Sequence, residues 1–303
     1  MKIGYPCINR TVVCYGEKTF RLKSYSVDKL ISTVSNNLVC LQKILEYNVK
    51  NSLLFFRISS DLVPFASHPI CTYKWQHHFK NEFQSIGRFI QNHNMRISMH
   101  PDQFIVLNSP YKGVVKRSIA ELQYHADILE LMNLDNSAKI QLHVGGVYTD
   151  KSTAQKRFLK RYSELPESIQ RRLVIENDDR LYSVKDCLFL SSQTQMPILL
   201  DSFHHSLLNN GESIQNALTS IQPTWKENDG IPMVDYSNQK PNYRAGAHAE
   251  YIDEGLFTTF LKKSRPYDID IMLEIKDKEK SAIKAINIAQ HDSRYYRTEV
   301  TYE

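Results

Sequence analysis

Short apolar strands and longer helical segments alternate through nearly the whole chain, and this alternation constrains the fold most. Eight segments have the β-branched or continuous apolar pattern of buried strands, and a segment with helical apolar spacing follows each. The expected strands are 2–8, 52–58, 95–100, 139–143, 172–176, 197–201, 230–236 and 269–274. The expected helices are 27–47, 78–93, 113–132, 151–163, 183–191, 211–221, 250–263 and 278–289. Eight such units without a linker predict an α/β fold, a single-domain (β/α)8 TIM barrel of parallel strands ringed by helices.

The bounds of this domain follow from the same pattern. We expect the barrel to span residues 1–290 and a polar, tyrosine-rich peripheral tail to span 291–303. With 42% hydrophobic residues among 303, the chain can bury a substantial core. It contains no apolar run near the roughly 20 residues that span a bilayer, and its start lacks a signal-peptide pattern, so we expect no membrane partner.

Cysteine usage and net charge indicate the setting. The five cysteines are odd in number, scattered and without a CxxC pair, which favours reduced thiols over a disulfide framework or a thiolate metal site. We therefore expect a cytoplasmic protein, associated with the nucleoid if it is prokaryotic. The net charge of +5 permits a polyanionic partner without requiring one.

Chemically active side chains stand where the expected strands end. In barrels of this kind the chemistry gathers at the C-terminal rim. The strand ends are Tyr5, Arg57, His100, His143, Glu176, Asp201, Asp235 and Glu274, and the loops that follow add His68, His204 and His248. If the barrel closes, these side chains converge in one mouth.

The carboxylates at this rim need a cation nearby. Glu176 follows the apolar run Leu173 to Ile175, and burying its charge without a partner costs several kcal/mol. Three or more carboxylates packed together repel one another unless cations neutralise them, and mixed histidine and carboxylate ligands suit Zn, Mn or Fe. The pattern predicts a multinuclear divalent metal site.

Each of these residues also has a structural explanation when it is taken singly. His100 or His143 could be a hydrogen-bonded core residue, and Glu176 or Glu274 could be an ion-pair partner of Arg57. Asp201 could be a helix N-cap, and Asp235 a turn residue. The joint pattern favours the metal site. The histidines expected at solvated positions are His77, His78, His93, His125 and His291, and the solvated loop is 178–180.

A metal cluster in such a rim could hydrolyse a phosphodiester or isomerise a sugar. The other rim residues are Tyr5, Asn9, Gln103, Phe104, Tyr148 and Arg244. Aromatic and amide groups on loops can stack on or replace bases, and base stacking contributes about 1–3 kcal/mol. These residues favour a nucleic-acid substrate over a small sugar.

At this point the motifs resemble those of the UV damage endonuclease family. The matching segments are Gly4-Tyr5-Pro6, Asn9, Arg57-Ile58-Ser59-Ser60, Pro64, His68-Pro69, Met99-His100-Pro101-Asp102-Gln103-Phe104, His143-Val144-Gly145-Gly146, Ile175-Glu176-Asn177-Asp178, Leu200-Asp201, His204, Ala247-His248 and Leu273-Glu274. They run in order from about residue 2 to 277.

The resemblance implies an activity. The family is similar to endonuclease four and shares its barrel with up to three divalent metals, usually manganese. It nicks DNA immediately 5′ to UV photoproducts, and abasic or other distorting lesions would be further substrates. A metal-activated water would leave a 3′-hydroxyl and a 5′-phosphate. The resemblance thus implies damaged double-stranded DNA as partner and two or three Mn²⁺ ions, with Zn²⁺, Co²⁺ or Mg²⁺ as alternatives; we also expect a monomer.

The resemblance also implies roles for single residues. The metal ligands would be His100, His143, Glu176, Asp201, His204, Asp235, His248 and Glu274. Glu176 would bridge two ions, and the catalytic residues would be His100, Glu176 and Glu274. Residues contacting DNA or the lesion would be Tyr5, Asn9, His68, Gln103 and Phe104. His68 could bind a phosphate or a metal, and Gln103 and Phe104 would wedge into the duplex opposite the lesion.

One segment departs from the family pattern. Where the family usually carries Lys-x-His-x-Ser, this chain has Met233, Asp235 and Ser237. Asp235 would replace a histidine ligand, which manganese tolerates, whereas Met233 removes a lysine. Two other functions stay open: a metal-dependent sugar isomerase or epimerase, and a catalytically decayed DNA-binding barrel.

Overall fold

Strand pairing runs in chain order and closes on itself. The computed structural model describes residues 1–296, and in it every strand pairs in parallel with the next, while β1 pairs with β8. The strands are β1 (Ile3–Pro6), β2 (Phe55–Ile58), β3 (Arg96–Met99), β4 (Lys139–His143), β5 (Leu173–Glu176), β6 (Ile198–Asp201), β7 (Met233–Tyr236) and β8 (Asp270–Leu273). The predicted (β/α)8 barrel is confirmed.

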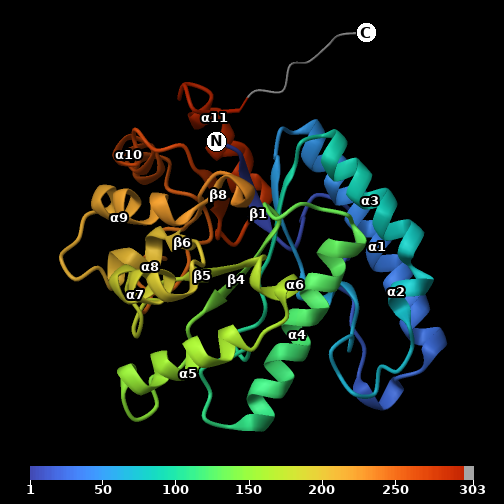
Figure 1. Ribbon diagram of the computed structural model, residues 1–303. Coiled ribbons are helices and arrows are strands. Elements are labelled where there is room, and N and C mark those ends of the chain that lie inside the picture. The colour runs from blue at the N-terminus through green and yellow to red at the C-terminus, as the bar shows by residue number, and fades with distance from the viewer. Residues whose placement is uncertain (297–303) are drawn as a thin grey trace.

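Helices surround this barrel, with α1 to α4 on one side of the strands and α7 to α10 on the other (Figure 1). The α-helices are α1 (Val27–Lys50), α2 (Trp75–His78), α3 (Lys80–Asn92), α4 (Lys112–Leu131), α5 (Lys151–Ser163), α6 (Glu167–Gln170), α7 (Val184–Thr194), α8 (Ser202–Leu207), α9 (Ile214–Ile221), α10 (Glu254–Lys263) and α11 (Glu279–Ala289). Short 3-10 helices are η1 (Leu22–Ser24), η2 (Ser60–Leu62), η3 (Gln222–Thr224) and η4 (Glu227–Asp229). The eight expected helices are all present, and α2, α6 and α8 are additions.

Local chemistry explains where the bounds differ from expectation. The strand expected from Ser52 begins at Phe55, because Ser52 has φ 57° and belongs to the turn that ends α1. The helix expected from Gly211 begins at Ile214, because Gly211 has φ 79° and Ser213 provides the N-cap. In both cases a turn residue marks the bound more sharply than apolar spacing does.

The strand alternation arranges the barrel interior in layers. A separate cluster of buried residues fills the middle of the barrel: Phe55, Val174, Leu199, Trp225, Met233 and Met272. Two positions further along five strands stand Arg57, Glu176, Asp201, Asp235 and Glu274. Because side chains two apart in a strand share a face, an apolar layer lies directly beneath this charged layer.

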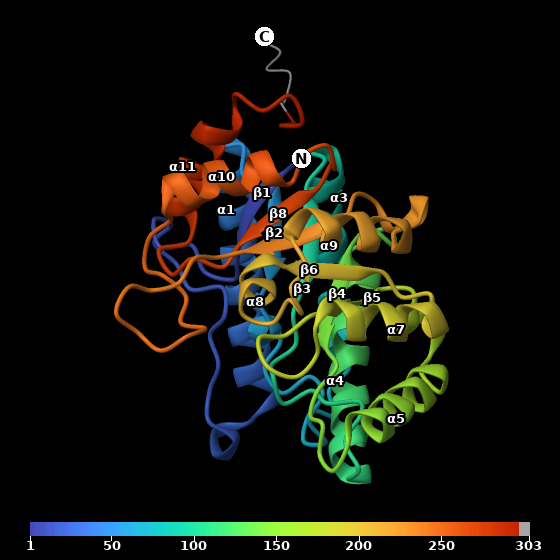
Figure 2. The same cartoon turned by 90° about the vertical axis from the view of Figure 1, so that its left-hand side faces the viewer.

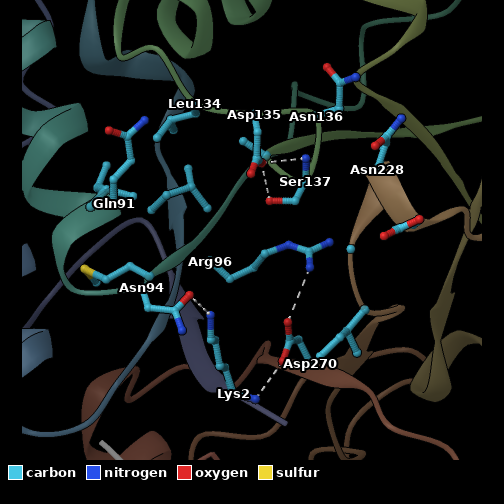
Figure 3. Close-up of a pocket in the computed structure, with 17 residues that line it drawn as sticks. Lys2, Gln91, Asn94, Arg96, Leu134, Asp135, Asn136, Ser137, Asn228 and Asp270 are labelled. Carbon is cyan, nitrogen blue, oxygen red and sulfur yellow. Dashed lines mark hydrogen bonds and ion pairs between the residues drawn. The ribbon is translucent and has the colours of Figure 1, made fainter.

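The opposite end of the barrel also carries charge, but there it is paired. A cavity of about 730 Å³ opens at the N-terminal ends of the strands. In Figure 3, Arg96 lies against Asp270, with 3.4 Å between Nη1 and Oδ2, and the backbone N–H of Lys2 donates to the same carboxylate at 2.7 Å. The Nζ of Lys2 donates to Asn94 at 2.9 Å. These contacts tie β1, β3 and β8 together, so this end reads as a stabilising face.

The structure contradicts the expectation for two of the cysteines and describes only part of the expected tail. Cys14 and Cys40 form a disulfide between the loop after β1 and helix α1, so the prediction that all thiols stay reduced is wrong for this pair. Residues 26 positions apart give no spacing signal for such a contact. Of the expected tail, 291–296 bind the body, since the N–H of Tyr296 donates to the Met1 carbonyl at 2.9 Å. Residues 297–303 lie outside the described chain.

Within residues 1–296, no helix combines the length and the apolar character that crossing a membrane requires.

Close packing of α3 against α4 gives a stability prediction. A Cβ added at Gly87 would lie 1.8 Å from the backbone oxygen of Met132, so alanine forces the two helices apart. We expect Gly87→Ala to lower the free energy of unfolding by about 2–4 kcal/mol in urea denaturation. Gly113→Ala is the matched control, because its Cβ meets only Arg117 Nη1 at 3.7 Å. Equal stability of both variants would contradict this account of the α3–α4 contact.

Candidate metal centre

Glu176 is the residue around which the predicted ligands gather. It ends β5 and points into the barrel, two positions after Val174 of the interior layer. Its Oε2 lies 3.4 Å from Nε2 of His100 and 3.7 Å from Nε2 of His143. Its Oε1 lies 3.6 Å from Nδ1 of His204. The two oxygens therefore face different histidines, as a carboxylate that bridges two cations must.

Asp201 ends β6 and uses its two oxygens differently. Oδ1 accepts the backbone N–H groups of Phe203 and His204, each at 2.8 Å, and so caps helix α8. Oδ2 lies 3.2 Å from Nδ1 of His204. The Asn177 side chain fixes the backbone of Asp201 from β5 through two hydrogen bonds of 3.0 Å. The N-cap explanation is correct, and it leaves Oδ2 for a cation.

Arg57 forms ion pairs with two of the predicted ligands. Its Nη2 lies 2.6 Å from Oδ2 of Asp235, and its Nη1 pairs with Glu274. Gln141 donates to Oδ2 of Asp235 at 2.8 Å and to Oε2 of Glu176 at 2.9 Å. The ion-pair explanation thus holds for Glu274, and Asp235 lies in a strand and is not a turn residue. Oδ1 of Asp235 is buried without a hydrogen-bond partner in the described chain.

Three groups of these side chains could each hold a metal ion, because one donor atom per residue lies within 4.8 Å of the others. The groups are His100–His143–Glu176, Glu176–Asp201–His204 and Asp201–Asp235–Glu274. Glu176 is shared by the first two and Asp201 by the last two. Within residues 1–296, His248 and His68 belong to none of them.

The electrostatics of the carboxylates fit a cation site. Burial raises the pKa of Glu176 well above its usual range, and Asp235 and Asp201 raise it further. Burial also raises the pKa of Asp235 to about 7 and that of Asp201 above its usual value. For Glu274, burial is outweighed by Arg57, which holds its pKa below the usual range. Cations placed among these oxygens would relieve their repulsion.

Two of the histidines, His100 and His143, are in the protonation state that ligation needs. Burial lowers the pKa of His143 to about 4 and that of His100 well below its usual value, so both are neutral at pH 7. Neutral imidazole is the metal-binding form. Burial also lowers the pKa of His204, but Asp201 and Glu274 outweigh it and raise that pKa. The donor set of imidazoles and carboxylates fits a divalent ion such as Zn, Mn or Fe.

A closed loop of residues 238–249, here the β7 loop, positions His248 at the rim. Gln239 and His248 form an antiparallel bridge at its base. Nδ1 of His248 lies 2.9 Å from Oγ of Ser237 and 3.0 Å from the carbonyl of Glu274, which leaves Nε2 3.9 Å from Oε2 of Glu274. The loop, in orange, projects from the barrel in Figure 2.

The first two residues predicted to contact DNA are buried. The hydroxyl of Tyr5 donates to Oδ1 of Asn48 at 2.6 Å and accepts from Nδ2 of Asn9 at 2.7 Å. Oδ1 of Asn9 accepts the N–H groups of Thr11 and Val12 at 2.9 and 2.7 Å. The Tyr5 side chain points toward α1 and is buried, and the Tyr5–Asn9 pair shapes the loop that follows β1.

The other three residues predicted to contact DNA are exposed. Gln103 and Phe104 lie in the loop that follows β3, and the Phe104 side chain is 74% exposed. His68 is exposed too, and its Nδ1 accepts the N–H of Ile70 at 3.1 Å. All three side chains could reach a bound macromolecule.

A cavity of about 500 Å³ opens beside the metal groups at the C-terminal mouth. Its lining includes Arg57, His100, His143, His248, Glu274, Gln103 and Lys278. This C-terminal cavity is smaller than the N-terminal one, but it is the cavity that several of the predicted metal ligands line.

His125 is a residue that the sequence placed wrongly. It is fully buried, although helical spacing predicted a solvated position. Its Nε2 lies 2.9 Å from Oγ of Ser60, and that hydroxyl donates to the carbonyl of His100 at 3.0 Å. His125 and Ser60 therefore support the backbone of a predicted ligand. Gln141 was also missed, although its place two residues before His143 in one strand was a signal.

Fold and site together define a class: a TIM barrel with a candidate multinuclear metal centre of histidines and carboxylates at its C-terminal mouth. Within that class, the chain belongs to the UV-endonuclease UvdE family, whose model matches residues 1–301.

Individual relatives agree with this assignment. The chain is 40% identical to the UV DNA damage endonuclease of Clostridium perfringens (strain 13 / Type A), over 99% of this chain and 74% of that protein. It superposes on the crystal structure of SacUVDE with a TM-score of 0.92 at 45% identity, over 96% of this chain and 98% of that one. The D-psicose 3-epimerase of Clostridium cellulolyticum H10 shares the fold alone, with a TM-score of 0.57 at 12% identity, over 96% of this chain and 98% of that one.

The buried His125 gives a pH prediction. Burial lowers its pKa from 6.5 to about 4, so as the pH falls the unfolded chain binds a proton before the folded one does. Its contribution is present above pH 6.5 and is lost between pH 6.5 and 4, by up to about 3 kcal/mol. We expect His125→Gln to lose less stability than wild type between pH 7 and 4 in urea denaturation. Parallel pH curves for the two proteins would contradict this role.

Proposed function

We propose that this protein is a metal-dependent DNA repair endonuclease that nicks the phosphodiester immediately 5′ to UV photoproducts. The observation that carries the proposal is the position of Glu176, whose two oxygens face His100 and His143 on one side and His204 on the other. Membership in the UvdE family supports the same activity. The products would carry a 3′-hydroxyl and a 5′-phosphate.

Each side chain has a defined task in this mechanism. Glu176, Asp201, His100, His143 and His204 would hold two divalent ions, most simply manganese. Such ions supply neutralisation of the phosphate charge and a lowered pKa for water. His100, with its depressed pKa, stays neutral and keeps its ring nitrogen for ligation at pH 7.

Asp235 and Glu274 would complete the centre with Arg57 between them. Arg57 offsets part of their charge, so the third group carries less negative charge than its residues suggest. We propose Glu274 as a catalytic residue with Glu176, since its carboxylate stays ionised under the influence of Arg57. His248, fixed by the β7 loop, would join Glu274 at the rim.

Damage would be recognised by deforming the duplex. Phe104, 74% exposed at the rim, would enter the base stack with Gln103 beside it. Separating a base step costs a few kcal/mol, and less where a lesion has already weakened the stack. The damaged bases would leave the stack toward the loop that Tyr5 and Asn9 shape, and His68 would contact backbone phosphate.

Basic groups around the rim would hold the DNA backbone without reading sequence. Lys240 and Arg244 lie in the β7 loop, where the Nζ of Lys240 lies 4.0 Å from the ring centroid of Tyr243. Tyr243 is 62% exposed. A cation and an exposed ring at one loop tip suit a phosphate and an unpaired base.

The two alternatives make different demands on this site. A sugar epimerase shares the barrel, but an exposed Phe104 at the rim has no task with a small substrate. A decayed barrel would tolerate loss of ligands, whereas the histidines and carboxylates of all three groups are in place. The nuclease accounts for both features.

Removal of the central carboxylate tests the activity. We expect purified protein with Mn²⁺ to nick UV-irradiated plasmid, chelator to stop it, and Glu176→Gln to lower the rate at least about 1,000-fold while DNA binding persists. Glu227→Gln, an exposed carboxylate at the opposite end, is the control. Full activity of Glu176→Gln, or epimerisation of ketoses without nicking, would overturn the proposal.

Truncation of the exposed ring tests recognition. Phe104→Ala removes the stacking face, so we expect it to lower nicking 5′ to a defined photoproduct by about 10- to 100-fold. An abasic site has already lost a base from the stack, so its cleavage should fall less. Tyr111→Ala, at another exposed ring, serves as the control. Equal losses on both lesions would argue against the wedge.

A further inference from the structure

Lys278 is a cation at the mouth of the barrel that belongs to none of the three candidate metal groups. Its side chain lines the same cavity as Arg57, His143 and Glu274. It is half-buried, and within residues 1–296 its ammonium group has no hydrogen bond and no ion pair. A partly desolvated ammonium without a partner is costly, so a ligand that pairs with it is expected.

The backbone at Lys278 is held in a strained conformation. Its φ is 60° and its ψ is −120°, a backbone conformation that residues other than glycine rarely adopt. Although Lys278 is the N-cap of α11, its side chain makes no capping hydrogen bond. The lysine therefore contributes nothing to the helix that a glycine would not, and the strain is unexplained by folding alone.

Neighbouring contacts keep this conformation in place. Before Lys278, the N–H groups of Lys276 and Asp277 donate to the carbonyls of Ala249 and Glu250, each at 3.1 Å. After it, the buried carboxylate of Glu279 accepts the N–H of Arg10 at 2.9 Å and the hydroxyl of Thr11 at 2.8 Å. The segment is thus anchored to the β7 loop on one side and to the loop after β1 on the other.

The surrounding charges leave Lys278 available. Arg57, a buried cation that lines the same cavity, is paired with Asp235 and Glu274. Burial lowers the pKa of Lys278, while Cys7 and Glu274 raise it and Arg57 and Arg10 lower it.

We propose that Lys278 binds a phosphate of the DNA backbone beside the candidate metal groups. This inference rests on the proposed nuclease function, which supplies the phosphodiester. An ammonium is a point-charge donor to phosphate oxygens, and phosphate groups in barrels of this fold often sit after strands 7 and 8, where this lysine stands.

Glycine at this position separates function from folding. Lys278→Gly suits the positive φ and removes the ammonium, so we expect its Tm to equal or exceed that of wild type. Its kcat/KM for nicking a defined photoproduct should fall about 10- to 100-fold, as for loss of a charged hydrogen bond. Lys278→Arg keeps the charge and should keep activity within about threefold. Lys278→Gln, with a similar stem and no charge, should fall as Lys278→Gly does.

A binding experiment tests the phosphate contact without cleavage. In EDTA, the slope of log K against log salt for a lesion duplex should become shallower by about 0.9 in Lys278→Gly. Lys280→Gln removes the same charge from an exposed neighbour outside the cavity and should leave slope and nicking unchanged.

The outcomes separate this inference from the proposed function. If the wild type nicks and Lys278→Gly shows the same nicking rate and the same salt slope, the role of Lys278 is overturned and the nuclease proposal stands. A wild type that does not nick would overturn the nuclease, and a shallower slope in Lys278→Gly would still support the phosphate contact. A Tm lowered in parallel with activity in both Gly and Gln variants would mark Lys278 as structural and overturn the inference.

Discussion

Repulsion among buried carboxylates is the constraint on which the mouth of this barrel depends. Glu176, Asp201, Asp235 and Glu274 lie at or within one residue of the ends of four consecutive strands, and closure of the sheet brings them together. Arg57 offsets the charge of two of them but has no hydrogen bond to the other two. The remaining repulsion is visible in the raised pKa values of Glu176 and Asp201, which burial causes first. A folded barrel with this mouth is therefore prepared for cations before any substrate arrives.

Strand periodicity is strong enough to predict both the barrel and the residues at its rim. A buried parallel strand shows as a short apolar run, and the polar residue that ends it is a signal by contrast, as at Glu176 and His143. A helix residue that is buried by a tertiary contact behind the metal groups leaves no such contrast in the sequence. His125 stands in a helix with mixed spacing, and only the tertiary contact with Ser60 explains why it is buried.

Side-chain direction was the other limit. His143 ends β4, whereas Tyr5 lies one residue before the end of β1, and its side chain turns toward α1 and Asn48, outside the mouth. Successive side chains in a strand point to opposite faces. In a strand of four residues, the sequence does not show which of the last residues faces the barrel mouth. The position of Lys278 was not predictable either. It depends on a backbone conformation that the sequence, a charged helix start, does not reveal. The place of Met233, by contrast, follows from strand alternation: it belongs to the apolar interior layer with Phe55 and Met272.

The β7 loop has a consequence for how this barrel can vary. Loops at the rim of such folds usually tolerate insertions, because their ends are fixed by the strand and the helix they connect. Here Gln239 and His248 form a paired bridge at the base of the loop. The N–H groups of Lys276 and Asp277 donate to the carbonyls of Ala249 and Glu250, which follow His248. Adding or removing one residue next to the bridge, on either side of the loop, would shift the histidine relative to Glu274. Variation in length at this rim should therefore be confined to the tip around Tyr243, and the two sides of the loop should keep a fixed register.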